Sequence, residues 1–148
     1  MHGFFCGQGP NIIEREETLN MPKLFAVVAA MSGFLAVGLG AFGAHGLKGK
    51  VPPHLFDAYQ TAVQYQFYHV FALAFVAVLG FINLGGRLSI ISGWLFIVGT
   101  LFFSGSLYAL TFGGSKLFGP ITPLGGLCFM AGWLCLVVHL VVKIPTQQ

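Results

Sequence analysis

The stretch LFAVVAAMSGFLAVGLGAFGA, from Leu24 to Ala44, decides the fold, because it holds no Asp, Glu, Lys or Arg. Three further runs share this property: Ala58 to Gly86, Leu88 to Ser115 and Leu117 to Val142. A helix rises about 1.5 Å per residue, so about 20 apolar residues cross the roughly 30 Å hydrocarbon core of a bilayer. Four such runs predict an all-α fold, an integral membrane four-helix antiparallel bundle.

Glycines, prolines and charged residues between the runs set the expected helix boundaries. We predict one transmembrane domain over residues 21–148, with helices at about 23–44, 54–82, 88–112 and 124–142. Short connections make sequential helices antiparallel neighbours, so both termini share one membrane side. Lys and Arg number four on that side and three on the other: Arg15, Lys23, Arg87 and Lys143 against Lys48, Lys50 and Lys116. The positive-inside rule therefore favours cytoplasmic termini.

The composition fits a chain surrounded by lipid. Hydrophobic residues make up 56% of it and charged residues 7%, and the mean hydropathy is +0.84. A soluble domain carries about 25% charged residues, so the expected partner of this surface is the lipid bilayer. The net charge of +3 comes from scattered cations. This excludes nucleic-acid binding, which needs clustered Lys and Arg.

Residues 1–20 differ from the rest of the chain. They hold three of the four acidic side chains, Glu14, Glu16 and Glu17, and show no packing pattern. We interpret them as a disordered extension or as an upstream start, with Met21 as the biological initiator. A cleaved signal peptide that begins near Met21 is the alternative, but its apolar stretch exceeds the 7 to 15 residues or so expected of a signal.

Small residues recur along the first apolar run at helical spacing. The motif GLGAFG, Gly38 to Gly43, matches a dinucleotide-binding pattern. It lies inside an apolar run, however, and does not follow a strand, as that function requires. Small residues let helix backbones approach closely and gain dispersion contacts in lipid. We therefore predict helix-packing positions at Gly33, Ala36, Gly40 and Ala44, and at Gly125 and Gly126 in the fourth run.

Polar side chains gather toward the end of the predicted bundle that bears the first and third connections. Tyr65 and His69 lie one helical turn apart on one face, and FSGSLY follows in the third run. We call this set the polar pole: His45, Tyr65, His69, Ser104, Ser106, Tyr108 and Thr122. An ionisable residue inside a membrane span is a site hypothesis by default. The alternative, which we favour, is a neutral imidazole hydrogen-bonded to another helix.

The residues limit the chemistry of the polar pole. Outside residues 1–20, Asp57 is the only carboxylate side chain, which excludes paired-carboxylate catalysis. A serine hydrolase needs base, oxyanion donors and water access in one place, and hydrogen bonding explains the serines better. The three cysteines include no CxxC pair, and His69 and His139 lie at depths of about 12 Å and 22 Å, too different for one haem iron. We expect no metal, no cofactor and no enzymatic activity.

Four segments after Met21 occur in an order and at a spacing that resemble a known family. They are SGF and GLGAFGAHG within Ser32 to Gly46, YQFYH from Tyr65 to His69, LFFSGSLY from Leu101 to Tyr108, and TPLGGLCFMAGW from Thr122 to Trp133. The chain resembles the YgdD-like family of small four-helix inner-membrane proteins, domain of unknown function family 423. The resemblance implies a multi-pass protein of a bacterial-type inner membrane. It implies no reaction, because the function of the family is not established.

Two functions stay open, and a third, an enzyme or a quinone or haem binder, is the least favoured. The first is a non-enzymatic accessory subunit or homo-oligomer that packs against partners in the membrane, as the small-residue faces indicate. The alternative is a carrier of a small solute, a proton or a metal that uses the polar pole around His69. Four spans without clear broken helices in paired positions argue against a carrier.

Overall fold

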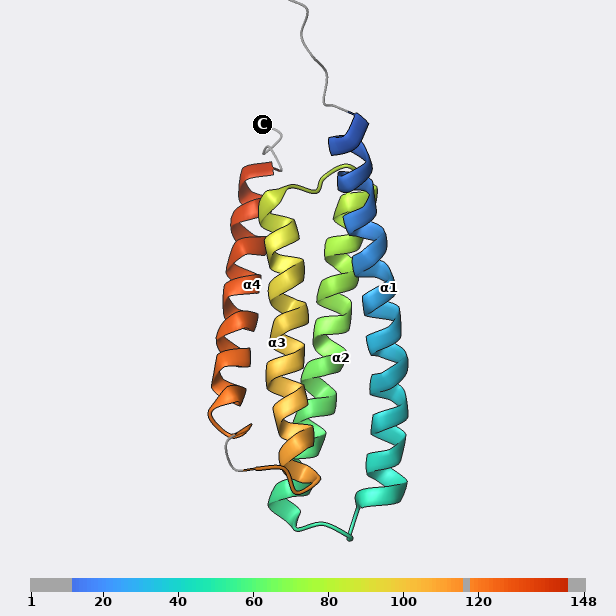
Figure 1. The fold of residues 1–148 in the computed structure, drawn as a ribbon, viewed down its shortest axis with the longest axis vertical. Helices are drawn as coiled ribbons and strands as arrows, with labels where there is room; N and C mark the ends of the chain where they lie inside the picture. The colour runs from blue at the N-terminus through green and yellow to red at the C-terminus, as the bar shows by residue number, and fades with distance from the viewer. Residues whose placement is uncertain (1–11, 116–117, 144–148) are drawn as a thin grey trace, which may run out of the picture.

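The computed structural model of the chain describes residues 12–115 and 118–143, with side chains described from Asn20 onward. Its four long helices are α1 (Ile12–Phe42), α2 (Pro53–Phe81), α3 (Arg87–Thr111) and α4 (Ile121–Lys143), drawn in Figure 1. Each is long and apolar enough to cross a membrane, and the described residues include no strand. The prediction of an all-α, four-helix membrane bundle is confirmed.

The helices run alternately up and down the long axis (Figure 1). The start of α1, the turn between α2 and α3, and the end of α4 lie together at what we call the terminal end. The connections from α1 to α2 and from α3 to α4 lie at the opposite, loop end. This antiparallel order follows from the short connections, which give a helix room only to turn back beside its predecessor.

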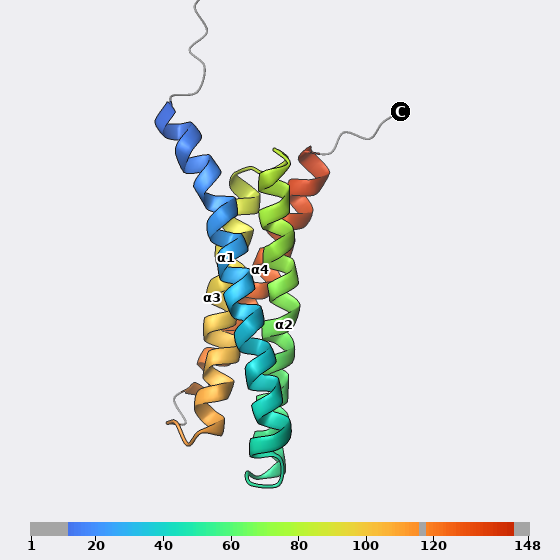
Figure 2. The ribbon, with the colours of Figure 1, turned by 90° about the vertical axis from the view of Figure 1, so that its right-hand side faces the viewer.

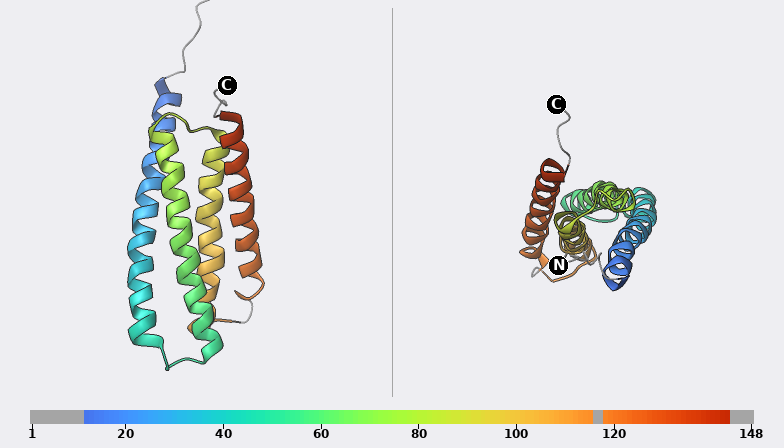
Figure 3. Two further views of the ribbon diagram at one scale, coloured as in Figure 1. Left: turned by 180° about the vertical axis from the view of Figure 1, so that it is seen from behind. Right: turned by 90° about the horizontal axis from the view of Figure 1, so that it is seen from above.

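Each helix packs mainly on its neighbour in the sequence. α1 packs on α2, α2 on α3 and α3 on α4, whereas the described parts of α1 and α4 have no comparable contact. Seen from above in Figure 3, α3 lies between α4 and α2, and α1 stands on the far side of α2. The bundle is therefore an open arrangement with α1 and α4 as its two edges.

The first helix begins eleven residues before its predicted boundary at Lys23, at Ile12. Residues 12–20, assigned from the sequence to an N-terminal extension, are thus part of this helix, while residues 1–11 lie outside the described residues. The segment 12–20 holds three Glu and one Arg, which are good helix formers, so the helix continues beyond the apolar run. The other three helices begin and end within three residues of their predicted bounds.

The winding changes at the loop end of α1, where residues Gly43–Leu47 form a π-helix, η1. Gly43 and Leu47 are buried, whereas Ala44 and His45 are exposed. A π-turn contains one more residue than an α-turn, so the small-residue face shifts its register here. Ala44, a predicted helix-packing position, is exposed here and borders a hollow beside Tyr59 and Val63 of α2.

One face of α1 packs closely on α2 through small residues. Ala29 and Ala36 are buried, and a Cβ added to Gly33 or Gly40 would meet a valine of α2 at 3.4 Å or 3.6 Å. These positions repeat at intervals of four and three, which keeps one side of a helix facing its partner. Such close approach holds helices together in lipid, where the hydrophobic effect does not drive them into contact.

Glycines of α3 and α4 lie against aromatic rings of the opposite helix. A Cβ added to Gly99 would lie 2.5 Å from the ring of Phe129, and one added to Gly132 would lie 2.7 Å from the ring of Phe96. Ser92 adds a hydrogen bond from its Oγ to the Gly132 carbonyl at 2.8 Å. Rings and glycines thus interlock along this interface.

The backbones of α3 and α4 approach each other most closely at the start of α4. A Cβ added to Gly125 would collide with the backbone nitrogen of Phe103. One added to Gly126 would lie 3.9 Å from the Phe103 ring, which is an ordinary contact. Only a glycine therefore fits at position 125, whereas position 126 has room for a side chain.

Candidate functional site

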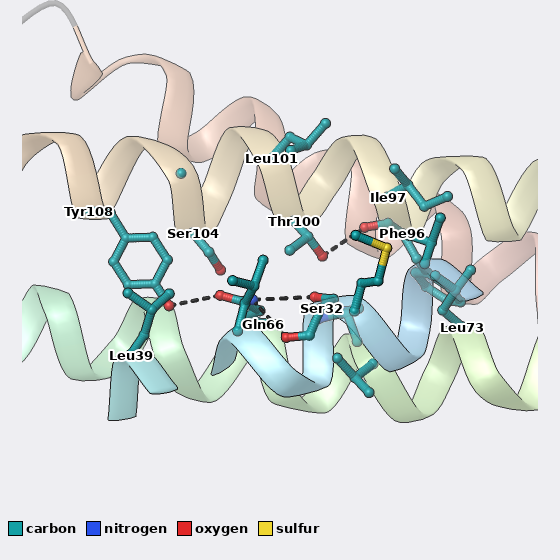
Figure 4. Close-up of a pocket in the computed structure, with 16 residues that line it drawn as sticks. Ser32, Leu39, Gln66, Leu73, Phe96, Ile97, Thr100, Leu101, Ser104 and Tyr108 are labelled. Atoms are coloured by element: carbon teal, nitrogen blue, oxygen red, sulfur yellow. Dashed lines mark hydrogen bonds between the residues drawn. The ribbon is translucent and has the colours of Figure 1, made fainter. Parts of the chain in front are cut away.

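A groove lies between α1 and α3, and α2 forms its floor (Figure 4). Its volume is about 410 Å³. Most of the side chains that line it are apolar, and the polar ones come from all three helices: Ser32, Gln66, His69, Thr100, Ser104 and Tyr108. These residues lie near the middle of their helices or in the half toward the loop end, so most of the groove lies within the part of the molecule that spans the membrane.

Aromatic contacts join α1 to α3, or to the residue that follows α3, beyond both ends of the groove. Toward the terminal end, Phe25 lies against Gly93, and its ring centroid is 6.0 Å from that of Trp94. Toward the loop end, the ring centroids of Phe42 and Phe112 are 6.3 Å apart. Figure 2 shows α1 running obliquely across the bundle, aligned with α2 and apart from α3 toward the loop end. The groove therefore opens sideways, where lipid surrounds the protein in a membrane.

A chain of hydrogen bonds links the three helices along the groove (Figure 4). Tyr108 Oη donates to Gln66 Oε1 at 2.8 Å. Gln66 Nε2 in turn donates to the Ser32 carbonyl at 3.0 Å and approaches Ser32 Oγ at 3.3 Å. Because both ends of the Gln66 carboxamide have partners, this polar side chain is stable in hydrocarbon.

The other hydroxyl groups of the groove donate to backbone carbonyls. Ser104 Oγ donates to the Ala62 carbonyl of α2 at 2.8 Å. Thr100 Oγ1 donates to the Phe96 carbonyl of its own helix at 2.9 Å. The hydroxyl hydrogens of Ser104 and Thr100 therefore already have acceptors within the protein.

His69 is the exception, because one of its ring nitrogens has no partner. The residue is only 6% exposed, and its Nδ1 lies 2.8 Å from the Tyr65 carbonyl. A carbonyl only accepts hydrogen bonds, so Nδ1 carries the proton and donates. Nε2 is buried and has no hydrogen-bond partner. The imidazole ring stacks on Phe129 of α4, with centroids 3.4 Å apart and planes at 8°.

The structure brings three residues of the predicted polar pole together. His69, Ser104 and Tyr108 all line the groove. Tyr65, which is 39% exposed, lies on the other side of His69, in a hollow between α2 and α4. His69 therefore stands between two lateral hollows of the bundle.

The remaining residues of the polar pole lie elsewhere. The hydroxyls of Ser106 and Thr122 bond to each other at 2.6 Å, joining α3 to the start of α4. His45 is exposed within η1 and lines neither hollow. These residues lie at a similar depth along the bundle. Their side chains do not meet, because they project from different faces of their helices.

Gln66 and Ser32 are groove residues that the predicted polar pole lacks. Gln66 lies on the same face of α2 as His69, three residues away, and a glutamine in an apolar span must find a partner. That signal was present in the sequence. Ser32 contributes mainly its backbone carbonyl, for which a sequence holds no signal.

No three His, Cys, Asp or Glu side chains among the described residues gather closely enough to hold a metal ion. The groove itself is lined by one such residue, His69. Its chemistry is therefore that of hydrogen bonds and apolar contacts.

Fold and groove together define a small multi-pass membrane protein with a hydrogen-bonded lateral groove. The family described as "Protein of unknown function (DUF423)" matches residues 39–126, and the chain belongs to this family, as the resemblance implied. The UPF0382 membrane protein YwdK of Bacillus subtilis is 46% identical over 117 residues, which are 78% of this chain and 94% of that protein.

Relatives from staphylococci are similar to the chain over the same extent. A UPF0382 membrane protein of Staphylococcus aureus is 44% identical over 119 residues, 78% of this chain and 93% of the relative. One of Staphylococcus haemolyticus has the same identity and coverage. No solved structure matches the chain. The names of these relatives state a membrane protein and no activity, so the function of the family is not established.

Proposed function

We propose that the protein is a non-enzymatic accessory protein of the membrane that holds one lipid-soluble molecule in its lateral groove. The observation that carries the proposal is the groove between α1 and α3, with its volume of about 410 Å³. Small-molecule sites have volumes of about 300 to 1,000 Å³, apolar walls and a few placed polar groups. The groove has all three properties.

The sideways opening favours a guest that arrives from the lipid. Met31 and Leu101, which line the groove from α1 and α3, are 62% and 65% exposed. Aromatic contacts lie between the groove and each end of the bundle. A carrier of an aqueous solute needs a path to those ends, so this arrangement supports lipid binding over the carrier function.

The size of the groove favours a single apolar chain over a partner helix. Its lining residues in α1 run from Val28 to Leu39, about 16 Å at the rise of an α-helix. A partner helix about 10 Å in diameter would need a gap of that width along this length, whereas an extended apolar chain is much narrower.

The serines of the polar pole support a role without catalysis. Ser104 donates to the Ala62 carbonyl and Ser106 to the Phe103 carbonyl. A nucleophilic serine needs its base within hydrogen-bond reach, whereas His69 has the Tyr65 carbonyl as its partner. Binding is therefore the activity that these side chains favour.

A second copy or another membrane subunit has a different surface available. α1 and α4 are the edges of the bundle, and α4 exposes large apolar side chains such as Met130, Leu134 and Val141. We propose that the protein associates through these edges, with a second copy or with another membrane subunit. Crosslinking in native membranes tests this, because a chain that stays monomeric at all protein-to-lipid ratios contradicts it.

We also propose a bacterial-type inner membrane with both termini in the cytoplasm. The named relatives come from Bacillus and Staphylococcus, and Lys and Arg favour the terminal side by four to three. Green fluorescent protein fused after Gln148 is expected to fluoresce, and alkaline phosphatase fused there to stay inactive. The reverse pair of results contradicts the orientation.

Two exposed glycines provide a matched test of the groove. A Cβ added to Gly105 or to Gly38 has no atom within 4 Å, so both positions have room for a side chain. Only Gly105 lines the groove. We expect Gly105→Leu to fill the groove and Gly38→Leu to leave it open.

The probe is a sixteen-carbon alcohol with a photoreactive diazirine in its chain, added to the protein in nanodiscs. We expect Gly105→Leu to lower specific labelling by about tenfold, which corresponds to about 1.4 kcal/mol of binding free energy. Gly38→Leu should label as the unchanged protein does, with labelled peptides mapping to the walls of the groove. Equal labelling of both variants contradicts the proposal.

A further inference from the structure

We infer that the guest of the groove carries a hydroxyl group, an alcohol or a phenol, which donates a hydrogen bond to His69 Nε2. This inference rests on the proposed function and specifies the chemistry of its ligand. It starts from one observation, the buried Nε2 atom that has no hydrogen-bond partner in a residue that lines the groove.

The partner of Nδ1 fixes the hydrogen-bonding role of Nε2. Because the Tyr65 carbonyl can only accept, the Nδ1 proton is committed to it at 2.8 Å. In a neutral imidazole the other nitrogen then presents a lone pair. Nε2 therefore accepts a hydrogen bond and does not donate one.

None of the surrounding polar groups donates to Nε2. Tyr108 Oη donates to Gln66, and Gln66 Nε2 donates to Ser32. Ser104 and Thr100 donate to backbone carbonyls. Among the described residues, Nε2 is thus the one buried side-chain nitrogen or oxygen without a hydrogen-bond partner, and a guest complements it only by donating.

Charge and surroundings select among the possible donors. No Asp or Glu lines the groove, so an ammonium group would enter hydrocarbon without a counter-ion, at a cost of several kcal/mol. The imidazole lies between aromatic rings, stacked on Phe129 and with its centroid 5.4 Å from that of Phe96. A neutral hydroxyl on an apolar body is the donor that fits these surroundings.

Nε2 is covered in the structure, with almost no surface open to a water-sized probe. A guest therefore reaches it by displacing a neighbouring side chain. The covered position also excludes water, so a hydrogen bond formed there has no competitor.

The test compares two probes that differ in one hydrogen-bond donor. They are the sixteen-carbon photoreactive alcohol and its methyl ether, each applied in nanodiscs to the unchanged protein and to His69→Phe. Phenylalanine keeps an aromatic ring for Phe129 to stack on and removes both ring nitrogens. We expect the alcohol to bind the unchanged protein about two- to tenfold better than the ether, the worth of one hydrogen bond. In His69→Phe this preference should disappear.

The outcomes separate the inference from the proposed function. Equal binding of alcohol and ether by the unchanged protein overturns the inference, as does a preference that persists in His69→Phe. If both probes nevertheless lose binding in Gly105→Leu, the groove still binds apolar chains and the proposed function stands. If neither probe responds to Gly105→Leu, the proposed function fails as well. Should His69→Phe not fold, the alcohol-to-ether ratio of the unchanged protein decides alone.

Discussion

The α3–α4 interface and the space between α1 and α3 use the same residue types with opposite results. Between α3 and α4, glycines and rings interlock, so that a Cβ at Gly99 or Gly132 would lie under 3 Å from an aromatic carbon. Beside α1, a Cβ at Gly105 of α3 would have no neighbour within 4 Å. Glycine therefore marks close packing in one region and an open wall in the other.

The comparison teaches that the partner residue decides what a glycine does in a membrane helix. Phe129 and Phe96 fill the space left by Gly99 and Gly132. Opposite Gly105 the groove continues, and the nearest polar side chains are held by bonds to the protein itself. The open wall is thus not a packing defect, because its polar groups other than His69 Nε2 are satisfied.

Gly125→Leu should have the largest effect on stability. The new side chain would collide with the backbone of Phe103, which cannot rotate away as a side chain can. We expect a loss of about 3 kcal/mol or more, at the upper end of overpacking, measured as thermal unfolding in detergent. Gly126→Leu is the control, since its Cβ has an ordinary contact at 3.9 Å. Equal losses at both positions contradict the interlocked interface.

Gly40→Leu tests the α1–α2 contact and should cost somewhat less. Its Cβ would lie 3.6 Å from Val63, so an alanine fits there but the rest of a leucine does not. We expect a loss of about 1 to 3 kcal/mol from overpacking in the same unfolding assay. An unchanged melting temperature would place this face of α1 toward lipid.

The sequence predicted the spans well because one property, the absence of charge over about 20 residues, reports directly on the bilayer. It gave no sign that the first helix continues through residues 12–20, beyond the apolar run. It also gave no sign of the π-helix at Gly43–Leu47, which changes the register near Ala44. Neither event leaves a signal in hydropathy.

The site was predictable only in part for a related reason. The residues His69, Ser104 and Tyr108 were all found from polarity within apolar runs, and all line the groove. The groove itself depends on the angle between α1 and α3, which Phe25 and Phe42 help to set from its two ends. A crossing angle follows from packing at many positions and cannot be read from the residues that line the resulting space.

Ser92→Ala should have a smaller effect than either leucine substitution. Its hydroxyl donates across the interface to the Gly132 carbonyl at 2.8 Å, and hydrogen bonds between membrane helices contribute on average about 0.6 kcal/mol, with a maximum near 1.7. Thr100→Val is the matched control, because the Thr100 hydroxyl bonds within its own helix. A control that costs as much as Ser92→Ala would show that interhelical bonding is not the cause.

Gly105→Leu should have the smallest effect on stability, although it is the same change that is most damaging at Gly125. No atom lies within 4 Å of the new Cβ, so no neighbour has to move. Leucine also favours a helix over glycine by roughly 1 kcal/mol in water, which offsets any small loss. We expect the free energy of unfolding in detergent to stay within about 0.5 kcal/mol of the unchanged protein, as is usual for substitutions away from packed features. Because stability is expected to stay level while probe labelling falls, this variant separates folding from binding. A loss of unfolding free energy above about 1 kcal/mol would mean that other atoms already fill the space beside Gly105. In that case no groove is open there to a guest.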